Sequence, residues 1–360
     1  MMHRTITSLI LVTAVLLLAG PVLGSDDLVL PTTMCSDFFI AEVSINGQGP
    51  WPMVVDSGAA STVLSDHVAG IIGGVDEVQS LSIGEFKARG NLHIFSRSMD
   101  QLSHALGTRI EGIVGHPVFQ KVLLTYDYPG RELRVGSGNL PDEGQGIVPT
   151  GKEKRPYVDV RIGGKRFMAL IDTGSGRGLT LSRKKRYRYR EPLRPTGATI
   201  RINGLFFSRA GRLAGEMKLG PLTLQEPIIH EGVKKGYSGS LVGQQILRGY
   251  VLTFDQLNRR MRFEGPVDKP LQFEPFYGIG AAFDPKEKGF PVVAVFPGSG
   301  AEAAGLKVGD ILLAKDGVNL WERDCPEDAA YATEPLDIVL TILRDGEEVD
   351  LTITTRALVP

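Results

Sequence analysis

The sequence predicts an all-β protein with two related lobes followed by a small third unit. The first observation is a duplicated stretch, in which an apolar run ends in an acid, a hydroxyl residue and a glycine at 53–59 and again at 169–175. The second is the spacing of alternating segments, typical of β-strands. The third is a Pro/Gly-containing linker near 266, after which the composition changes.

The surroundings of the duplicated stretch repeat as well. Alternating segments that end in a turn, 38–47 and 155–164, precede the two acids. Downstream, Gly-Ile-Val-Gly at 112–115 matches Ser-Leu-Val-Gly at 240–243, and each is followed by a further strand at the same offset. Self-similarity of this kind indicates two large repeated units, which place the first lobe at 25–148 and the second at 149–265.

These motifs resemble those of the pepsin and retropepsin superfamily of aspartic peptidases. Asp-Ser/Thr-Gly followed by two apolar residues and a glycine occurs twice in the correct order, and the resemblance covers roughly 36 to 265. It implies a bilobal pepsin-like fold, in which each second motif threads beside the first as a psi-shaped loop. The residues of these loops would be Ile113, Val114, Gly115, Leu241, Val242 and Gly243. The sequence departs from the pepsin pattern in lacking a tyrosine between Leu81 and Asp100 and in reading Asp-Ser-Gly-Ala at the first motif.

The resemblance implies that Asp56 and Asp172 are catalytic. Two carboxylates a few Å apart share one proton, because both cannot ionise easily. The ionised member then acts as a general base on water, with neither metal nor organic cofactor. The residues expected to support the pair are Ser57, Gly58, Thr173, Gly174 and Ser175.

The same family geometry predicts which acid is ionised. Ser57 and Thr173 would hydrogen-bond across the pair to the opposite loop. Ser175 would donate to Asp172, whereas Ala59 at the matching place cannot donate to Asp56. Because a hydrogen bond to the charged form favours ionisation, we expect Asp172 to be the anion and Asp56 the acid.

A candidate flap lies between the two motifs of the first lobe. The alternating segment 81–90 is bracketed by glycines and reads as a β-hairpin, with Phe86 the aromatic residue expected over substrate. The alternative is an ordinary hairpin with an outward phenylalanine.

The first 24 residues read as a secretory signal peptide, with Arg4 before an apolar run and a cleavage site after Gly24. An uncleaved membrane anchor is the alternative. The expected location is therefore periplasmic or secreted. The 25–37 segment is too short for the prosegment of a pepsin zymogen.

The net charge and the number of cysteines indicate which binding partners and which cross-links to expect. The net charge of −1 argues against a nucleic-acid partner, and the basic run 183–190 is expected to be a solvated loop. Cys35 and Cys325 are the only cysteines and fall in different predicted units. We expect two separate thiols packed as small hydrophobes, with one disulfide as the alternative in an exported chain.

After the linker at 266–272, the segment 273–357 resembles the PDZ domains of bacterial envelope proteases. The resemblance is carried by Gly-Ser-Gly-Ala-Glu-Ala-Ala-Gly at 298–305 and Gly309-Asp310. Gly278, Ile279 and Gly280 match the family loop that captures a peptide C-terminus. A peptide C-terminus is therefore the expected partner of this unit, and a chain ending near Asp268 is expected to fold and to cut short peptides about as well as the whole.

Three functions fit these features. The first is an exported aspartic endopeptidase, a hydrolase acting on peptide or protein substrates, with a PDZ domain for docking. The second is a catalytically silent protein that binds peptides in the cleft or the PDZ groove. The third is a dimer whose chains share acids, although two complete motif sets favour a monomer.

Overall fold

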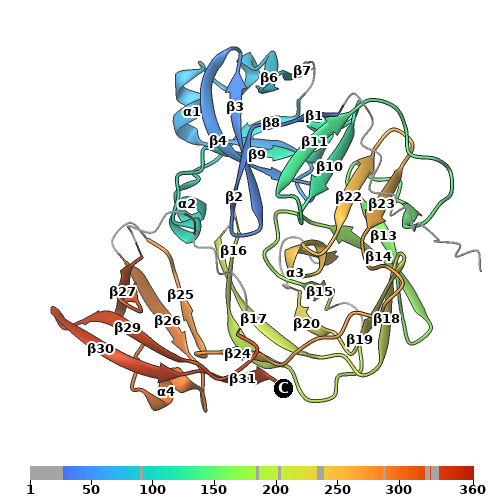
Figure 1. Cartoon of the computed structure of the whole chain (residues 1–360). Coiled ribbons are helices and arrows are strands. Elements are labelled where there is room, and N and C mark those ends of the chain that lie inside the picture. Colours follow the sequence, from blue (N-terminus) through green and yellow to red (C-terminus); the bar gives the residue numbers. More distant parts are fainter. Residues whose placement is uncertain are drawn as a thin grey trace, which may run out of the picture.

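The computed structural model describes residues 27–89, 92–183, 186–201, 204–232, 239–286, 289–320, 325 and 332–360. The described chain is mostly β-structure, with two curled half-barrel sheets and a separate sheet in the C-terminal part (Figure 1). The all-β prediction is therefore confirmed. The predicted signal peptide lies outside the described residues.

The N-terminal lobe is built around one sheet, with short helices at its edges. Central strand β4 is buried at Met53, Val54 and Val55 because it lies between β3 and β9. Helix α1 is capped by Ser65, whose hydroxyl accepts a hydrogen bond from the Val68 amide at 3.0 Å. The elements are β2 (Thr32–Cys35), β3 (Phe38–Ile45), β4 (Gln48–Asp56), β5 (Thr62–Leu64), α1 (Asp66–Ile71), η1 (Val75–Glu77), β6 (Ser80–Ile83), β7 (Phe86–Arg89), β8 (Ile94–Ser96), α2 (Asp100–Leu106), β9 (Gly112–Gly115) and η2 (His116–Phe119).

The C-terminal lobe repeats this arrangement in the same chain order. Strand β14 lies antiparallel to β13 and parallel to β21, as β4 lies antiparallel to β3 and parallel to β9. The elements are β13 (Tyr157–Ile162), β14 (Lys165–Ile171), β15 (Leu179–Leu181), β16 (Arg194–Arg201), β17 (Gly204–Arg212), β18 (Glu216–Leu219), β19 (Leu222–Gln225), β20 (Ile228–Glu231), β21 (Ser240–Val242) and α3 (Gln244–Leu247).

A third sheet joins the lobes, and its strand order β1-β11-β10-β22-β23-β12 is symmetric about its middle. At the centre the hydroxyls of Thr125 and Thr253 lie 3.1 Å apart. Strand β12 pairs with β23, so the predicted lobe boundary at 148 falls inside a strand that belongs with the second half. The strands are β1 (Leu28–Val29), β10 (Leu123–Asp127), β11 (Glu132–Gly136), β12 (Ile147–Pro149), β22 (Val251–Asp255) and β23 (Arg260–Glu264).

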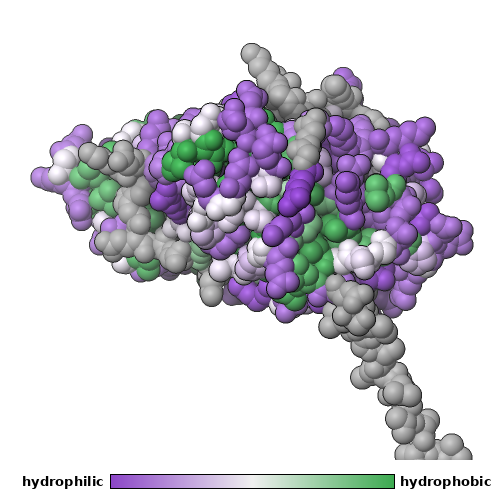
Figure 2. Space-filling model, turned by 90° about the horizontal axis from the view of Figure 1, so that it is seen from above, coloured by the Kyte–Doolittle hydropathy of each residue, from purple (hydrophilic) through white to green (hydrophobic). Residues whose placement is uncertain are grey.

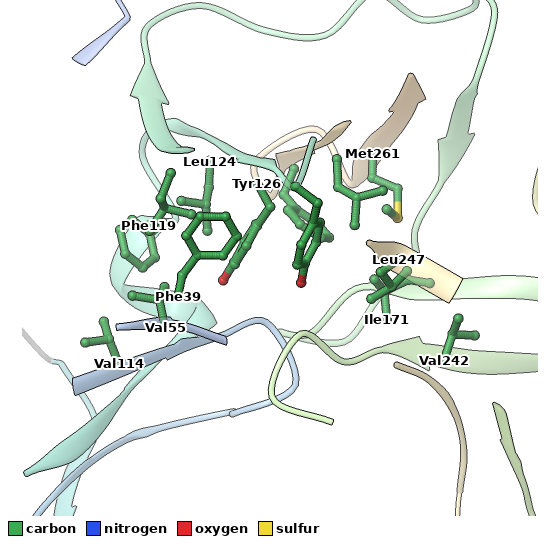
Figure 3. Close-up of a cluster of buried hydrophobic side chains, with 14 of the residues drawn as sticks. Phe39, Val55, Val114, Phe119, Leu124, Tyr126, Ile171, Val242, Leu247 and Met261 are labelled. Carbon is green, nitrogen blue, oxygen red and sulfur yellow. The ribbon is translucent and has the colours of Figure 1, made fainter. Parts of the chain in front are cut away.

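One apolar cluster runs through both lobes and the sheet between them. Figure 3 shows side chains of the first half, among them Phe39, Val55 and Tyr126, facing Ile171 and Val242 of the second. Burying this much apolar surface together stabilises the two lobes as one body.

The C-terminal domain, residues 273–360, has a six-stranded sheet, a separate pair of strands (β24 with β31) and a core of its own, and it lies beside the lobes (Figure 1). Strand β31 continues to Val359, beyond the predicted end at 357. Its elements are β24 (Phe276–Gly278), β25 (Ala281–Phe283), β26 (Phe290–Val295), α4 (Gly300–Ala303), β27 (Ile311–Lys315), β28 (Val318–Asn319), β29 (Asp337–Arg344), β30 (Glu347–Thr354) and β31 (Arg356–Val359).

Several contacts hold the C-terminal domain against both lobes. Cys35 of the N-terminal lobe and Cys325 form a disulfide, so the expectation of two separate thiols is wrong. The chain fold brings their Cα atoms to 4.7 Å, although 290 positions separate them in sequence. The Gln101 amide donates to Asp284 at 2.8 Å. An apolar cluster across the contact with the C-terminal lobe comprises Ala210, Ile228, Phe276, Leu358 and Val359.

Within the described ranges, no helix is long and apolar enough to cross a membrane. The face seen in Figure 2 is largely hydrophilic, with separate hydrophobic areas.

Candidate active site

The ends of β4 and β14 bring Asp56 and Asp172 together between the lobes. Asp56 is the last residue of β4, and Asp172 follows β14 directly. Strand β9 runs parallel to β4, with Val114 beside Val55. Strand β21 lies beside β14 in the same way, and the Asp172 amide donates to the Val242 carbonyl at 2.9 Å. Five of the six predicted psi-loop residues thus lie alongside the strands that carry the acids, and the sixth, Gly243, directly follows β21.

The loops that follow the acids are locked to each other by their hydroxyl residues. The Ser57 amide donates to the Thr173 hydroxyl at 2.9 Å, and the Thr173 amide donates to the Ser57 hydroxyl at 3.1 Å. Each hydroxyl also donates to a carbonyl of the opposite strand, Ser57 to Ile171 at 2.8 Å and Thr173 to Val55 at 3.4 Å. Since both side chains are almost completely buried, this network fixes the relative position of the two acids.

Glycine is required at 58 and 174 because each backbone touches the opposite acid. A Cβ at Gly58 would overlap the Asp172 carboxyl, and a Cβ at Gly174 would overlap the Asp56 carboxyl. The close approach lets the Gly58 and Gly174 amides donate to the same Asp56 oxygen, Oδ1, at 2.6 and 2.9 Å. Any side chain at either position would separate the carboxyls.

The surroundings of the two acids set different pKa values. Burial raises the pKa of Asp56, while the two glycine amides, the Asp172 carboxyl and the Arg155 charge act to lower it. Burial raises the pKa of Asp172 well above its usual range, and the negative charge of Asp56 raises it further. Because two amides donate to Asp56 and such donors stabilise the charged form, Asp56 is the more readily ionised of the two acids and Asp172 the more readily protonated.

This order reverses the one expected from the sequence. The expectation relied on a hydrogen bond from Ser175 to Asp172, but the Ser175 hydroxyl lies against Gly243, where an added Cβ would be 3.0 Å from it. The Ser175 amide instead donates to the Asp172 carbonyl at 3.2 Å. The backbone amides on Asp56, which a motif does not reveal, decide the order.

Arg155 is a site residue that sequence reasoning missed. Its guanidinium donates to the Gly58 carbonyl at 3.2 Å and to the Tyr157 hydroxyl at 2.8 Å, and it lies 5.4 Å from the Tyr157 ring centroid. It therefore brings positive charge to the loop of the first acid from the start of the second lobe. Its position just before strand β13 is the only signal that the sequence offers.

The residue after each psi-loop glycine also supports the site. The His116 amide donates to the Ala59 carbonyl at 3.0 Å, and the Gln244 amide donates to the Ser175 carbonyl at 2.8 Å. The Gln244 side chain further donates to the Thr173 carbonyl at 2.7 Å. Burial lowers the pKa of His116 to about 3, which keeps its imidazole neutral at physiological pH. Neither residue was among the site residues expected from the sequence.

A buried tyrosine lies near the acids. The Tyr126 ring is fully buried in the cluster of Figure 3 and packs edge-on against Phe39 and Phe254. Burial raises the pKa of its phenol, so the group stays neutral beside Asp56 and Asp172.

The predicted flap residue, Phe86, packs against the core of the N-terminal lobe. Phe86 is at the start of β7, and its ring stacks on the fully buried Phe119 with centroids 5.3 Å apart. The hairpin turn at Gly84 is so close to Pro31 that an added Cβ would be 2.8 Å from it. The Phe86 ring and the turn of this hairpin are therefore packed against other parts of the N-terminal lobe.

The predicted carboxylate loop of the C-terminal domain lies between β24 and β25. Gly280 has a positive φ of 79° and approaches Ser299 so closely that a Cβ would overlap it. The Gly280 carbonyl accepts from the Phe296 amide at 2.9 Å, and the Ile279 carbonyl accepts from the Ala301 amide at 2.8 Å. Gly278 ends β24, so this loop is held against α4 at the start of β25.

The other candidates from the sequence do not belong to the surroundings of the two acids. Most of the basic run 183–190 is described, and its Arg183 and Arg190 form ion pairs with Glu231 and Glu226. In the described part of the chain, no three His, Cys, Asp or Glu side chains gather in a way that could hold a metal ion.

Neither family models nor sequence comparison places this chain in a known family. No protein-family model matches it, and no curated protein matches its sequence.

Proposed function

We propose that the protein is an aspartic endopeptidase of the pepsin and retropepsin type, in which Asp56 and Asp172 hydrolyse peptide bonds. The observation that carries the proposal is the paired environment of the two carboxyls. Both are buried, which raises the pKa of each, and the negative charge of Asp56 raises the pKa of Asp172 further, whereas two backbone amides donate to one oxygen of Asp56. Such a pair supplies a base and an acid at the same place.

The proposed reaction uses both protonation states. The Asp56 carboxylate takes a proton from water, whose oxygen attacks the carbonyl carbon of the peptide bond, while Asp172 gives its proton to the carbonyl oxygen. The resulting diol then collapses. Asp56 passes its proton to the leaving nitrogen, the C–N bond breaks, and a diol hydroxyl returns a proton to Asp172, so the starting states are restored.

The interlocked loops support catalysis more than simple binding. A silent peptide-binding protein would not require glycine at both 58 and 174, where any side chain would enter the opposite carboxyl. Pre-organised groups of this kind are what stabilise a transition state.

We also propose that the C-terminal domain is a PDZ-like module that takes peptide C-termini at the 278–280 loop. The chain would act after export, in the periplasm or outside the cell, since its first residues have the pattern of a signal peptide. A disulfide between Cys35 and Cys325 supports an oxidising compartment.

Cleavage of unfolded casein tests the proposal. The Asp56→Asn and Asp172→Asn variants should each lose turnover by several orders of magnitude with the fold intact by circular dichroism, and a statine-type inhibitor should block the wild type. The exposed Asp268→Asn is the matched control and should keep full activity. Wild-type rates in either dyad variant would refute the peptidase assignment and favour the silent peptide-binding protein.

A further inference from the structure

The hairpin β16–β17 breaks the symmetry between the lobes. Strands β5 and β6 of the first lobe correspond to β15 and β18 of the second, because they make the same pairings with their neighbours. Between β5 and β6 the chain forms α1 and η1, whereas between β15 and β18 it forms this long hairpin. The second lobe therefore carries an arm that the first lacks.

The base of the arm is anchored close to the second acid. Residues Ala210–Arg212 of β17 pair with β20. Farther along, Arg177, in the loop that follows Asp172, contacts the Ser208 hydroxyl on β17 and lies 3.0 Å from His230 Nδ1 on β20. Ser208 and His230 are buried. The arm is thus built onto the loop that carries Asp172.

From this base the arm spans to the other two parts of the molecule. Strand β16 lies against α2 of the N-terminal lobe and alongside β25 of the C-terminal domain (Figure 1). At the second contact a Cβ on Gly197 would be 3.7 Å from the Ala281 carbonyl. An element that starts on one lobe and reaches the other crosses the space between them.

A cation and an aromatic ring lie at the far end of the arm. Arg201 is the last residue of β16, and its guanidinium carbon is 5.6 Å from the Phe206 ring centroid on β17. Burial dominates the raised pKa of Asp172, and the positive charge of Arg201 acts on the same carboxyl in the opposite direction. The far end of the arm therefore carries a positive charge that acts on Asp172.

We propose that the β16–β17 hairpin is the arm that covers a peptide bound at the acids, and that Arg201 contacts this peptide. The inference rests on the proposed peptidase function. The β6–β7 hairpin is less suited to this role, because its Phe86 ring stacks on the buried Phe119. A guanidinium beside the cleft pairs well with a carboxylate, so peptides with an acidic residue next to the cleaved bond are the preferred substrates.

Hydrogen exchange with a statine-type peptide inhibitor tests the position of the arm. Amides in 194–201 and 204–212 should exchange more slowly with inhibitor bound, while those of the β29–β30 hairpin stay unchanged as an internal control. Inhibitor binding by calorimetry without protection of the arm, or with protection of β6–β7 instead, would overturn the inference. If the inhibitor does not bind and casein is not cleaved, the peptidase function fails, and this inference fails with it.

Paired peptides test the role of Arg201. Two substrates that differ only in Glu or Gln beside the cleaved bond should be separated by the wild type, and Arg201→Gln should lower the ratio of their kcat/KM values by about tenfold. Arg209→Gln is the matched control, since Arg209 lies exposed on the same hairpin and donates to the Leu193 carbonyl at 2.7 Å. Arg201→Lys should restore part of the ratio. An unchanged ratio in Arg201→Gln, with cleavage intact, would remove Arg201 from the substrate site.

Discussion

Ser57 and Thr173 exchange hydrogen bonds in both directions across the two lobes, amide to hydroxyl at 2.9 Å and 3.1 Å. This contact makes the position of each acid depend on the loop of the other. A change at one hydroxyl should therefore affect both carboxyls.

Thr173→Val should lower activity and stability together. It removes the acceptor of the buried Ser57 amide and the donor to the Val55 carbonyl. Each buried hydrogen bond contributes about 1 kcal/mol, and an unsatisfied partner costs about 1–3 kcal/mol. Thr173→Ser keeps the hydroxyl and is the control. Thermal unfolding and casein cleavage measure the two effects, and a valine variant with the activity of the serine variant would contradict the coupling.

Asp172→Asn should stabilise the protein at neutral pH while it abolishes turnover. The folded-state pKa of Asp172 lies well above the unfolded value of 3.8, so the native state binds more protons between the two values. The stability that protonated Asp172 contributes is therefore present at low pH and is lost as the pH rises through the folded pKa. Asparagine cannot ionise, so the variant does not lose this stability as the pH rises. Its Tm should therefore be a few degrees higher than that of the wild type at pH 7 and similar at pH 3.

The comparison needs Asp268→Asn as control, because that exposed side chain should leave Tm unchanged at both pH values. A dyad variant less stable than the wild type at pH 7 would show that the Asp172 carboxyl is not held in its neutral form by burial.

Arg155→Gln should move the acidic limb of the kcat/KM profile to higher pH. Burial raises the pKa of Asp56, and the Arg155 charge partly offsets this effect. Without the charge, the base protonates at a higher pH. Arg155→Lys keeps the charge, and Arg166→Gln removes an exposed arginine that pairs with Asp159. A limb that stays in place in Arg155→Gln, or moves equally in Arg155→Lys, would exclude the charge as the cause.

Cys325→Ser should destabilise the protein by roughly 2–5 kcal/mol, because the disulfide closes a very long loop. Dithiothreitol should lower the Tm of the wild type to that of the variant. It should leave the variant itself unchanged, which serves as the control. A wild-type Tm that does not respond to full reduction would mean that the link to Cys35 is not needed to hold the C-terminal domain.

A chain ending at Asp268 should be less stable and less active on short peptides than the whole protein, contrary to the expectation from the sequence. Its loss would uncover Ala210 and Ile228 and remove the β25 contact of the arm. Thermal unfolding and kcat/KM on a short peptide measure both effects. Equal values for the two proteins would restore the view of an independent C-terminal domain.

The sequence by itself determined the duplicated architecture. Apolar runs that end in Asp-Ser/Thr-Gly predict buried strands and tight turns from local chemistry alone, and the repeat indicates that Asp56 and Asp172 play matching parts. For the same reason the psi-loop residues, such as Val114 and Val242, could be identified as partners of those strands, because their order and spacing repeat.

Only the tertiary structure decided what depends on contacts between distant segments. The proton order within the pair follows from the Gly58 and Gly174 amides meeting at one Asp56 oxygen, and Arg155 reaches the first acid from the other lobe. Likewise, the Cys35–Cys325 bond and the path of the β16–β17 arm join parts that sequence reasoning had assigned to separate units. Local sequence specifies strands and turns through short-range preferences, whereas charge, burial and cross-links arise where the folded chain brings remote residues together.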